Sequence, residues 1–180
     1  MIIVKKYQSR IFLWISALFL ISAIEANESQ RFSNADFQME YPVSWKAITR
    51  ANAGRNFWID FQTLDQACVF SIRAQPTIEK NGDLGKIFES FIASQPASGK
   101  ITQPPARIRN EAAKNWGATE AYLAEMDYPG LKAFFYFFAR DLPKARYAYL
   151  VEVGIRAEGL GEGKCEDQVI QMRDSIRFLR

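Results

Sequence analysis

The residues of this chain that could do chemistry are few, and the first constraint on them is an absence. No histidine occurs in the 180 residues, which removes Ser-His-Asp and Cys-His nucleophiles, zinc sites built on histidine and c-type haem attachment. Paired carboxylates remain able to act as acid and base, but no spacing singles out a pair. We therefore expect a protein that is not an enzyme, without catalytic residues, cofactor or metal. An enzyme that uses carboxylates is the competing hypothesis.

The two cysteines, Cys68 and Cys165, are the next candidates. They lie far apart in the sequence, so they lack the C-x-x-C spacing of a redox or metal site. In an oxidising compartment such a pair is typical of one structural disulfide. The alternative is two unrelated buried thiols.

A group of acids surrounds the glycine-rich segment 156–164. Glu158, Glu162, Glu166 and Asp167 could supply carboxylate oxygens to a calcium ion. The EF-hand spacing is absent, and acids at this place also favour the N-terminus of a following helix. We expect the second role.

Trp58 is the aromatic residue that best fits a binding surface. In the strand-like segment 57–63, alternation places Trp58, Asp60 and Gln62 together on the face opposite Phe57, Ile59 and Phe61. A tryptophan beside polar side chains predicts a surface patch that contacts a partner.

The remaining aromatic residues have two interpretations. One is a groove that binds a peptide, a lipid or a partner, and the other is a core with two apolar sides, which we expect. The abundant aromatic residues are Phe57, Trp58, Phe61, Phe134, Phe135, Tyr136, Phe137, Phe138, Tyr147 and Tyr149.

The first segment of the chain has the layout of a secretory signal peptide. A basic start with Lys5, Lys6 and Arg10 precedes the apolar run 11–24, and Ala26 offers a small residue for cleavage. The alternative is an uncleaved membrane anchor, but the run is shorter than the roughly 20 residues of a spanning helix.

We therefore expect residues 1–26 to be a signal peptide cleaved after Ala26, with a cut after Ala23 as the alternative. Residues 27–180 then form one domain that is periplasmic or secreted. The formal net charge of +3 owes much to the basic start of the signal segment. The exported part is therefore nearly neutral.

Periodicity predicts how the cysteines are placed. Cys68 lies on the apolar face of a strand over 68–75, and Cys165 begins an apolar stripe on a final helix over 165–178. The stripe consists of Cys165, Val169, Met172, Ile176 and Leu179. Both thiols point at a core, so we expect a Cys68–Cys165 disulfide.

Most of the chain is strand-like, with one further helix. Residues 84–94 show the spacing of a helix laid on a core, with Asp83 as its N-cap. We expect strands over 36–40, 45–49, 57–63, 68–75, 116–127, 131–141 and 147–155, and an irregular segment over 96–105. The strand 131–141 is apolar on both faces, which favours a central strand covered on both sides. The pattern predicts an α+β fold: an α/β/α sandwich with a largely antiparallel central sheet and helices on both faces.

The order of elements and three short motifs resemble the PsbP-like α/β/α sandwich superfamily over about residues 32–179. The motif residues are Phe37, Tyr41, Pro42 and Trp45 near the start, Gly117 in the strand meander, and Ser175, Ile176 and Phe178 at the end. Relatives include an extrinsic photosystem subunit, a Ran-binding nuclear-transport factor and bacterial exported proteins such as the DcrB-like group. The resemblance implies an accessory or binding module without a shared catalytic site.

The expected function is therefore an exported, non-enzymatic accessory or binding module of the bacterial cell envelope. Its partner would be a protein or an envelope component, and the membrane would be contacted only through an uncleaved signal segment. The alternative is a carrier of a small apolar ligand or lipid in a cavity between helix and sheet. Nucleic acid is not expected, because Lys and Arg are scattered and Arg107 with Arg109 is the closest approach to a cluster.

Overall fold

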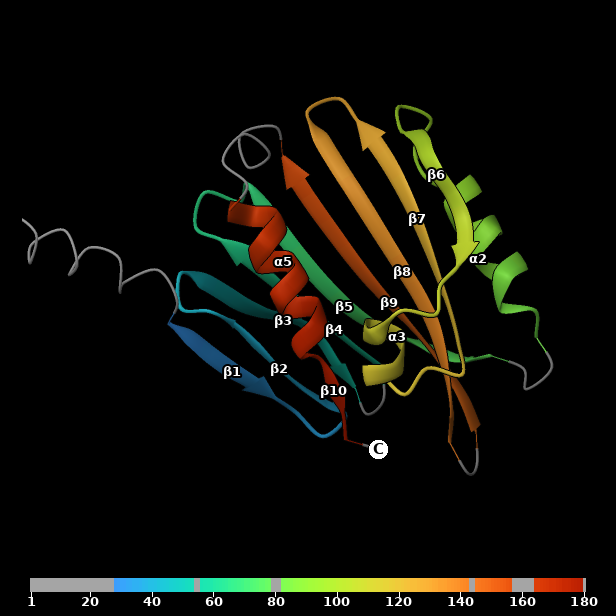
Figure 1. Ribbon diagram of the computed structural model, residues 1–180, viewed down its shortest axis with the longest axis horizontal. Coiled ribbons are helices and arrows are strands. Elements are labelled where there is room, and N and C mark those ends of the chain that lie inside the picture. Colours follow the sequence, from blue (N-terminus) through green and yellow to red (C-terminus); the bar gives the residue numbers. More distant parts are fainter. Residues whose placement is uncertain (1–27, 54–55, 79–81, 143–144, 157–163, 180) are drawn as a thin grey trace, which may run out of the picture.

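The computed structural model describes residues 28–53, 56–78, 82–142, 145–156 and 164–179 (Figure 1). The predicted signal segment 1–26 lies outside these ranges, as do Glu158 and Glu162 of the acidic group. Within the described ranges, no helix is both long and apolar enough to cross a membrane.

A seven-stranded antiparallel sheet dominates the molecule, with the strand order β3-β4-β5-β9-β8-β7-β6. Its strands are β3 (Trp45–Ala53), β4 (Asn56–Thr63), β5 (Cys68–Ile78), β6 (Lys100–Arg107), β7 (Glu120–Tyr128), β8 (Leu131–Leu142) and β9 (Ala145–Arg156). Strands that follow one another in the chain without a helix between them are antiparallel neighbours in this sheet: β3 with β4, β4 with β5, β7 with β8, and β8 with β9. The runs are rich in the apolar and β-branched residues that favour strands.

A second sheet of three antiparallel strands contains β1 (Ser29–Ser33), β2 (Phe37–Pro42) and β10 (Arg177–Phe178). It packs on the same side of the large sheet as α5 (Lys164–Ser175) and α3 (Glu111–Asn115) (Figure 1). Aromatic side chains fill the space between the two sheets, with Phe32 and Phe61 edge to face at 5.4 Å.

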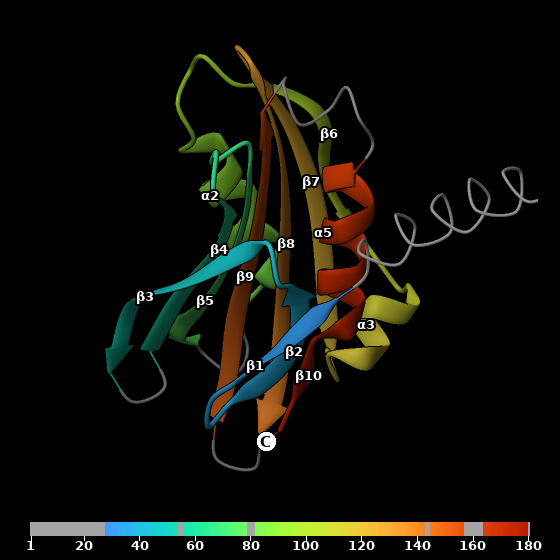
Figure 2. The same ribbon diagram turned by 90° about the vertical axis from the view of Figure 1, so that its left-hand side faces the viewer.

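The other face of the large sheet carries α2 (Leu84–Ala93), as the edge-on view shows (Figure 2). The predicted helix is confirmed, and the carboxylate of its N-cap Asp83 accepts a hydrogen bond from the backbone N–H of Lys86 at 3.1 Å. Phe88 stacks on Phe137 of β8, with ring centroids 5.4 Å apart. The helix covers only the part of this face formed by β6, β7 and β8.

The predicted α/β/α sandwich with helices on both faces is wrong. The described residues form ten strands in two antiparallel sheets with few helices, and no layer of helices covers either face of the large sheet. On one face the cover is a mixture of a small sheet and two helices. On the other face it is α2 alone.

β8 is nonetheless buried on both faces, as its apolar sequence predicted. Phe135 and Phe137 contact the α2 side, and Phe138 stacks on Trp116 at 4.6 Å on the opposite side. The error arose because a doubly apolar strand shows that both faces are covered, not what covers them.

Several elements also differ from the expected ones. The final helix ends at Ser175, and β10 follows it, so Leu179 is 50% exposed instead of completing the helical stripe. The segment expected to be irregular forms the edge strand β6, and the short helix α3 was not predicted. Gly117, with a φ of 63°, allows the tight turn that leads from α3 towards β7.

Candidate functional site

The predicted disulfide is confirmed. Cys68 on β5 is bonded to Cys165 at the start of α5, with a Cα–Cα distance of 6.3 Å, and both residues are buried. This distance lies within the usual range for disulfides of about 4.4–6.8 Å. Because intramolecular disulfides persist mainly in oxidising compartments, the bond indicates a location outside the cytoplasm.

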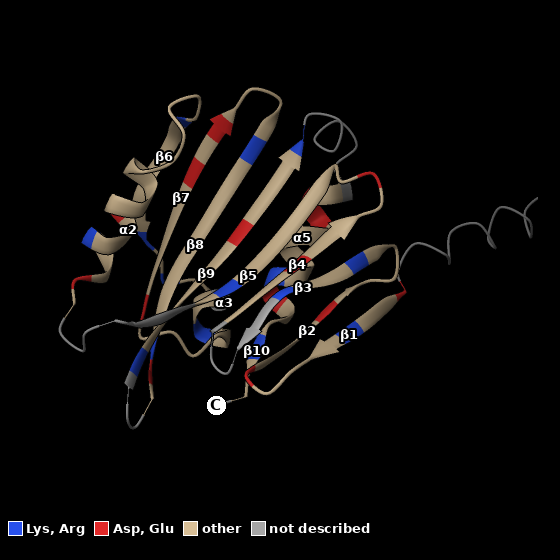
Figure 3. Cartoon of the chain, turned by 180° about the vertical axis from the view of Figure 1, so that it is seen from behind, with Lys and Arg blue, Asp and Glu red and all other residues tan. Residues whose placement is uncertain are grey.

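Trp58, Asp60 and Gln62 lie on the face of the large sheet that α2 leaves uncovered. Figure 3 shows this face, with α2 over β6 to β8 while β4 and β5 remain open. Ala148 and Leu150 of β9 belong to the apolar cluster under α2, whereas Glu152 of β9 lines the open part. Strand register places Asp60, Ser71 and Glu152 side by side across β4, β5 and β9. In the next row, Trp58 is paired with Arg73. Since neighbouring strands lie about 4.8 Å apart, these side chains form one continuous polar array.

Asp60 is the centre of this array and is only 8% exposed. Its carboxylate accepts hydrogen bonds from Arg50 Nε at 2.8 Å, Trp58 Nε1 at 2.7 Å and Ser71 Oγ at 2.6 Å. A buried carboxylate needs such donors to offset its desolvation. These bonds fix the indole ring of Trp58, which is nevertheless 38% exposed.

Arg73 links Trp58 to a second carboxylate. Its guanidinium lies 4.1 Å from the centroid of the Trp58 ring, and its NH2 group donates to Glu152 Oε2 at 2.5 Å. Burial raises the pKa of Glu152, the nearby Asp60 raises it further, and Arg73 opposes the rise. Arg73 Nε is buried and has no hydrogen-bond partner among the described residues.

A hollow of 270 Å³ opens beside these side chains, and we call it the Trp58 cleft. Its lining residues are Trp58, Asp60, Gln66, Val69, Ser71, Arg73, Leu131, Glu152, Gly154 and Arg156. The cleft therefore offers an aromatic ring, apolar side chains and charges of both signs at one place.

The structure brings together two of the three residues proposed for the partner surface. Trp58 and Asp60 line the cleft, whereas Gln62 lies on the same face outside the lining, next to Val69. The sequence analysis missed Ser71, Arg73 and Glu152. The alternation of β5 could have indicated Ser71 and Arg73, because they lie on the face opposite the apolar face of Cys68. Glu152 could have been noticed as a single acid inside an apolar strand.

A second hollow, the α5 groove, lies between α5 and the β7–β9 part of the sheet and has a volume of 390 Å³. Its floor is apolar, with Phe134, Val153 and Ile155 on the sheet and Val169 and Ile170 on the helix. Its charged lining residues are Glu125, Lys132, Glu166 and Arg173. Most other aromatic residues of the sequence are part of the core, as expected.

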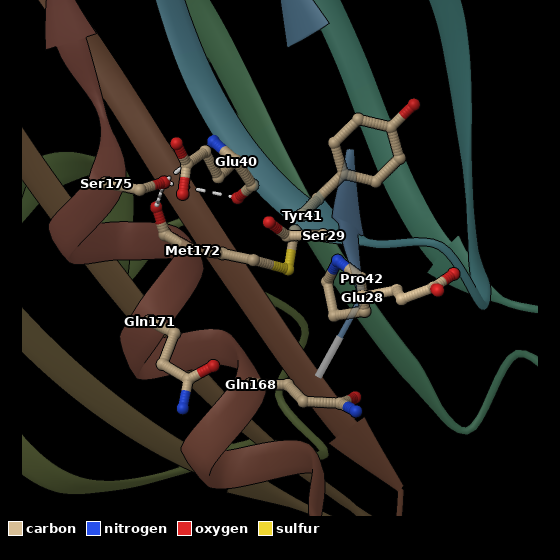
Figure 4. A pocket seen from close by; sticks show the side chains of 9 residues that line it. All are labelled: Glu28, Ser29, Glu40, Tyr41, Pro42, Gln168, Gln171, Met172 and Ser175. Atoms are coloured by element: carbon tan, nitrogen blue, oxygen red, sulfur yellow. Dashed lines mark hydrogen bonds between the residues drawn. The ribbon is translucent and has the colours of Figure 1, made fainter. Parts of the chain in front are cut away.

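A third hollow, of 290 Å³, lies between α5 and β2 (Figure 4). Its polar groups hold the two elements together. Ser175 Oγ accepts from the backbone N–H of Glu40 at 2.9 Å and donates to Met172 O at 2.8 Å. Beside it, Trp45 Nε1 donates to Gln168 Oε1 at 2.8 Å. We assign this hollow a structural role.

The acidic group considered for calcium is only partly described. Glu166 lines the α5 groove and Asp167 is exposed on α5. Within the residues that the structure describes, no three Cys, Asp or Glu side chains are grouped so that they could hold a metal ion.

No family model matches the chain, and no curated protein sequence matches it. Among solved structures, the chain is similar to LpqN of Mycobacterium tuberculosis, a protein described as involved in cell envelope biogenesis. The TM-score is 0.53 at 11% identity, and the match covers 88% of this chain and 96% of LpqN. The likeness shows a shared fold, and no family match supports the PsbP-like resemblance.

Proposed function

We propose that this protein is a non-enzymatic binding module of the cell envelope and that it contacts a protein partner through the Trp58 cleft. The observation that carries the proposal is a tryptophan that is both rigidly held and exposed on an uncovered sheet face. Tryptophan and arginine are the residues most enriched at energetic hot spots of protein interfaces.

The hydrogen bonds from Trp58 and Ser71 to Asp60, together with the stacking of Arg73, arrange the cleft before any partner arrives. Such preorganisation lowers the entropy cost of binding. Arg73 and Glu152 add charges that can set the orientation of a partner.

Binding is favoured over catalysis because both carboxylates of the cleft already have partners. Asp60 accepts three hydrogen bonds and Glu152 is paired with Arg73. A general acid or base needs a carboxylate that can exchange a proton with a substrate, whereas these two hold the tryptophan and the arginine in place.

The site of action follows from the N-terminal segment. Residues 1–26 act as a signal peptide, cleavage follows Ala26, and the mature domain works in the periplasm. Two observations support a location outside the cytoplasm: the disulfide between Cys68 and Cys165, and the description of the structural neighbour LpqN as involved in cell envelope biogenesis.

The α5 groove supports a second candidate function, the carriage of a small apolar ligand or lipid. The observation in its favour is the apolar floor at Phe134, Val153 and Ile155 within a hollow of 390 Å³, a volume typical of small-molecule sites at about 300–1,000 Å³. The α5 groove and the Trp58 cleft share no lining residue and lie on opposite faces of the sheet, so an experiment can distinguish the two candidate sites.

Photo-crosslinking in intact cells tests the proposal against this alternative. A photoreactive amino acid replaces either Gln62, beside the Trp58 cleft, or Ile170, in the α5 groove. We expect a discrete protein adduct from position 62. Lipid adducts from position 170 with no protein adduct from position 62 would overturn the proposal in favour of the carrier.

A further inference from the structure

A basic hollow lies at the junction of β6, α3 and β7, on elements that do not contribute to the Trp58 cleft. It has a volume of 340 Å³ and is lined by Arg107, Arg109 and Lys114, with Glu120 as its one acid. The two arginines, which looked like a solvated strand face in the sequence, thus lie around one concave surface.

Glu120 forms no ion pair with Arg107 or Arg109 in the described part of the chain. Its Oε2 accepts from Arg146 NH2 at 2.7 Å, and its Oε1 accepts from the hydroxyl of Tyr122 at 2.7 Å. Arg146 is the buried partner, with its side chain only 11% exposed. The carboxylate of Glu120 is therefore held by a guanidinium outside the lining of the hollow, and Asp141 Oδ1 also lies 3.5 Å from Arg146 Nε.

Arg107 and Arg109 are exposed, and within the described part of the chain neither guanidinium forms an ion pair or a hydrogen bond. The hydrogen bond to Glu120 raises the pKa of Tyr122, whereas the positive charge of Arg107 lowers it. Arg107 lies opposite Tyr122 in the register of β6 and β7. The donors of both guanidinium groups remain available to a ligand.

The backbone that carries these side chains is fixed. The N–H of Ile108 donates to Ala121 O at 2.9 Å, and the Asn110 side chain accepts from the N–H of Ala113 at 3.0 Å. On the far side, the N–H of Thr119 donates to Ala139 O at 2.9 Å. The two arginines therefore extend from rigid positions on either side of Ile108.

We propose that this hollow binds a phosphate group. Arg107 and Arg109 have no partner for their guanidinium groups among the described residues, and guanidinium forks match the geometry of phosphate oxygens. Either free inorganic phosphate or the phosphate of a lipid headgroup has the required chemistry. This assignment does not depend on the function of the Trp58 cleft.

Calorimetric titration of the mature protein at low ionic strength tests the assignment. The probes are inorganic phosphate, vesicles of phosphatidylglycerol, and vesicles of zwitterionic phosphatidylcholine as a control. We expect binding of inorganic phosphate if free phosphate is the source, and binding of phosphatidylglycerol but not phosphatidylcholine if the lipid headgroup is the source. Binding of neither anionic probe would overturn the assignment.

A double variant, Arg107→Gln with Arg109→Gln, should weaken binding about tenfold or more, because both groups able to make charge-assisted hydrogen bonds to the phosphate are removed. The matched control is Arg31→Gln with Lys46→Gln, which removes the same charge from exposed positions on β1 and β3. Equal affinity in the two double variants would contradict the proposal. A Trp58→Ala variant should bind phosphate as the parent does, which separates this site from the Trp58 cleft.

Discussion

Asp60 is the residue on which the geometry of the Trp58 cleft depends. It is nearly buried and joins three side chains from β3, β4 and β5 through its two oxygens. One of these side chains, Trp58, is the exposed ring that we expect a partner to contact. Asp60 is therefore a positioning residue, and its loss should affect both the stability and the shape of the cleft.

Replacement Asp60→Ala should lower the free energy of unfolding by about 2 kcal/mol, because three donors lose their shared acceptor in a largely buried place. Urea unfolding measures this change. The control Asp127→Ala removes an exposed carboxylate on β7 and should change stability by less than about 0.5 kcal/mol. Similar values for the two variants would show that the hydrogen bonds of Asp60 do not stabilise the fold.

Glu152 predicts a pH dependence with a definite sign. Its pKa is raised in the folded protein by burial and by Asp60, against the effect of Arg73, and Arg156 is a further charge at the same cleft. The folded state therefore holds the proton more tightly than the unfolded state does. This contribution to stability is full below the ordinary pKa of glutamate and is lost as the pH rises through the raised pKa.

Glutamine at this position stays neutral at every pH. The free energy of unfolding of the parent, minus that of Glu152→Gln, should therefore fall as the pH rises from the ordinary pKa of glutamate through the raised pKa of Glu152. Urea unfolding of both proteins at a series of pH values measures the difference. A difference that stays constant or grows with pH would refute the expected direction.

At the scale of elements, alternation predicted the strands well where one face is apolar and the other polar. The assignment of Trp58 and Asp60 to one face of β4, and of Cys68 to the apolar face of β5, came from this period alone. The interactions of Arg73 and Glu152 with Trp58 and Asp60 could not be predicted. They depend on which strands are neighbours and in which register, and β5 pairs with β9, far along the chain.

Two errors have local causes. β6 contains Pro104 and Pro105, which read as breaks but are tolerated in an edge strand, where one side has no partner to receive the missing N–H. α5 stops at Ser175 because the chain then pairs with β2 through Arg177 and Phe178. A tertiary strand pairing thus ended a helical pattern that the sequence continued.

The disulfide joins two elements from distant parts of the chain, with a sequence separation of 97. The double variant Cys68→Ser with Cys165→Ser should lower the free energy of unfolding by about 2–4 kcal/mol, because a long loop in the unfolded chain is no longer closed. Urea unfolding under non-reducing conditions measures the change, and parent protein treated with a reductant provides an independent check. A loss smaller than about 0.5 kcal/mol would contradict a stabilising role.

At the scale of the whole molecule, the cover of the large sheet is unequal. One face is closed by α5, α3 and the small sheet, while the other is closed by α2 over part of its width only (Figures 2 and 3). The open part has a fixed tryptophan, an arginine stacked on it and a hollow of 270 Å³. This asymmetry underlies the proposal that the molecule is a scaffold with one binding face.

The most direct test of that proposal is the dependence of partner capture on Trp58. With the photoreactive amino acid at position 62, the yield of the protein adduct is compared in the parent, in Trp58→Ala and in Ile101→Ala, which removes an exposed apolar side chain from β6. We predict that Trp58→Ala lowers the yield about tenfold or more, as expected for a hot-spot residue, while Ile101→Ala leaves it unchanged. An equal yield from all three proteins would contradict the assignment of the Trp58 cleft as the binding site.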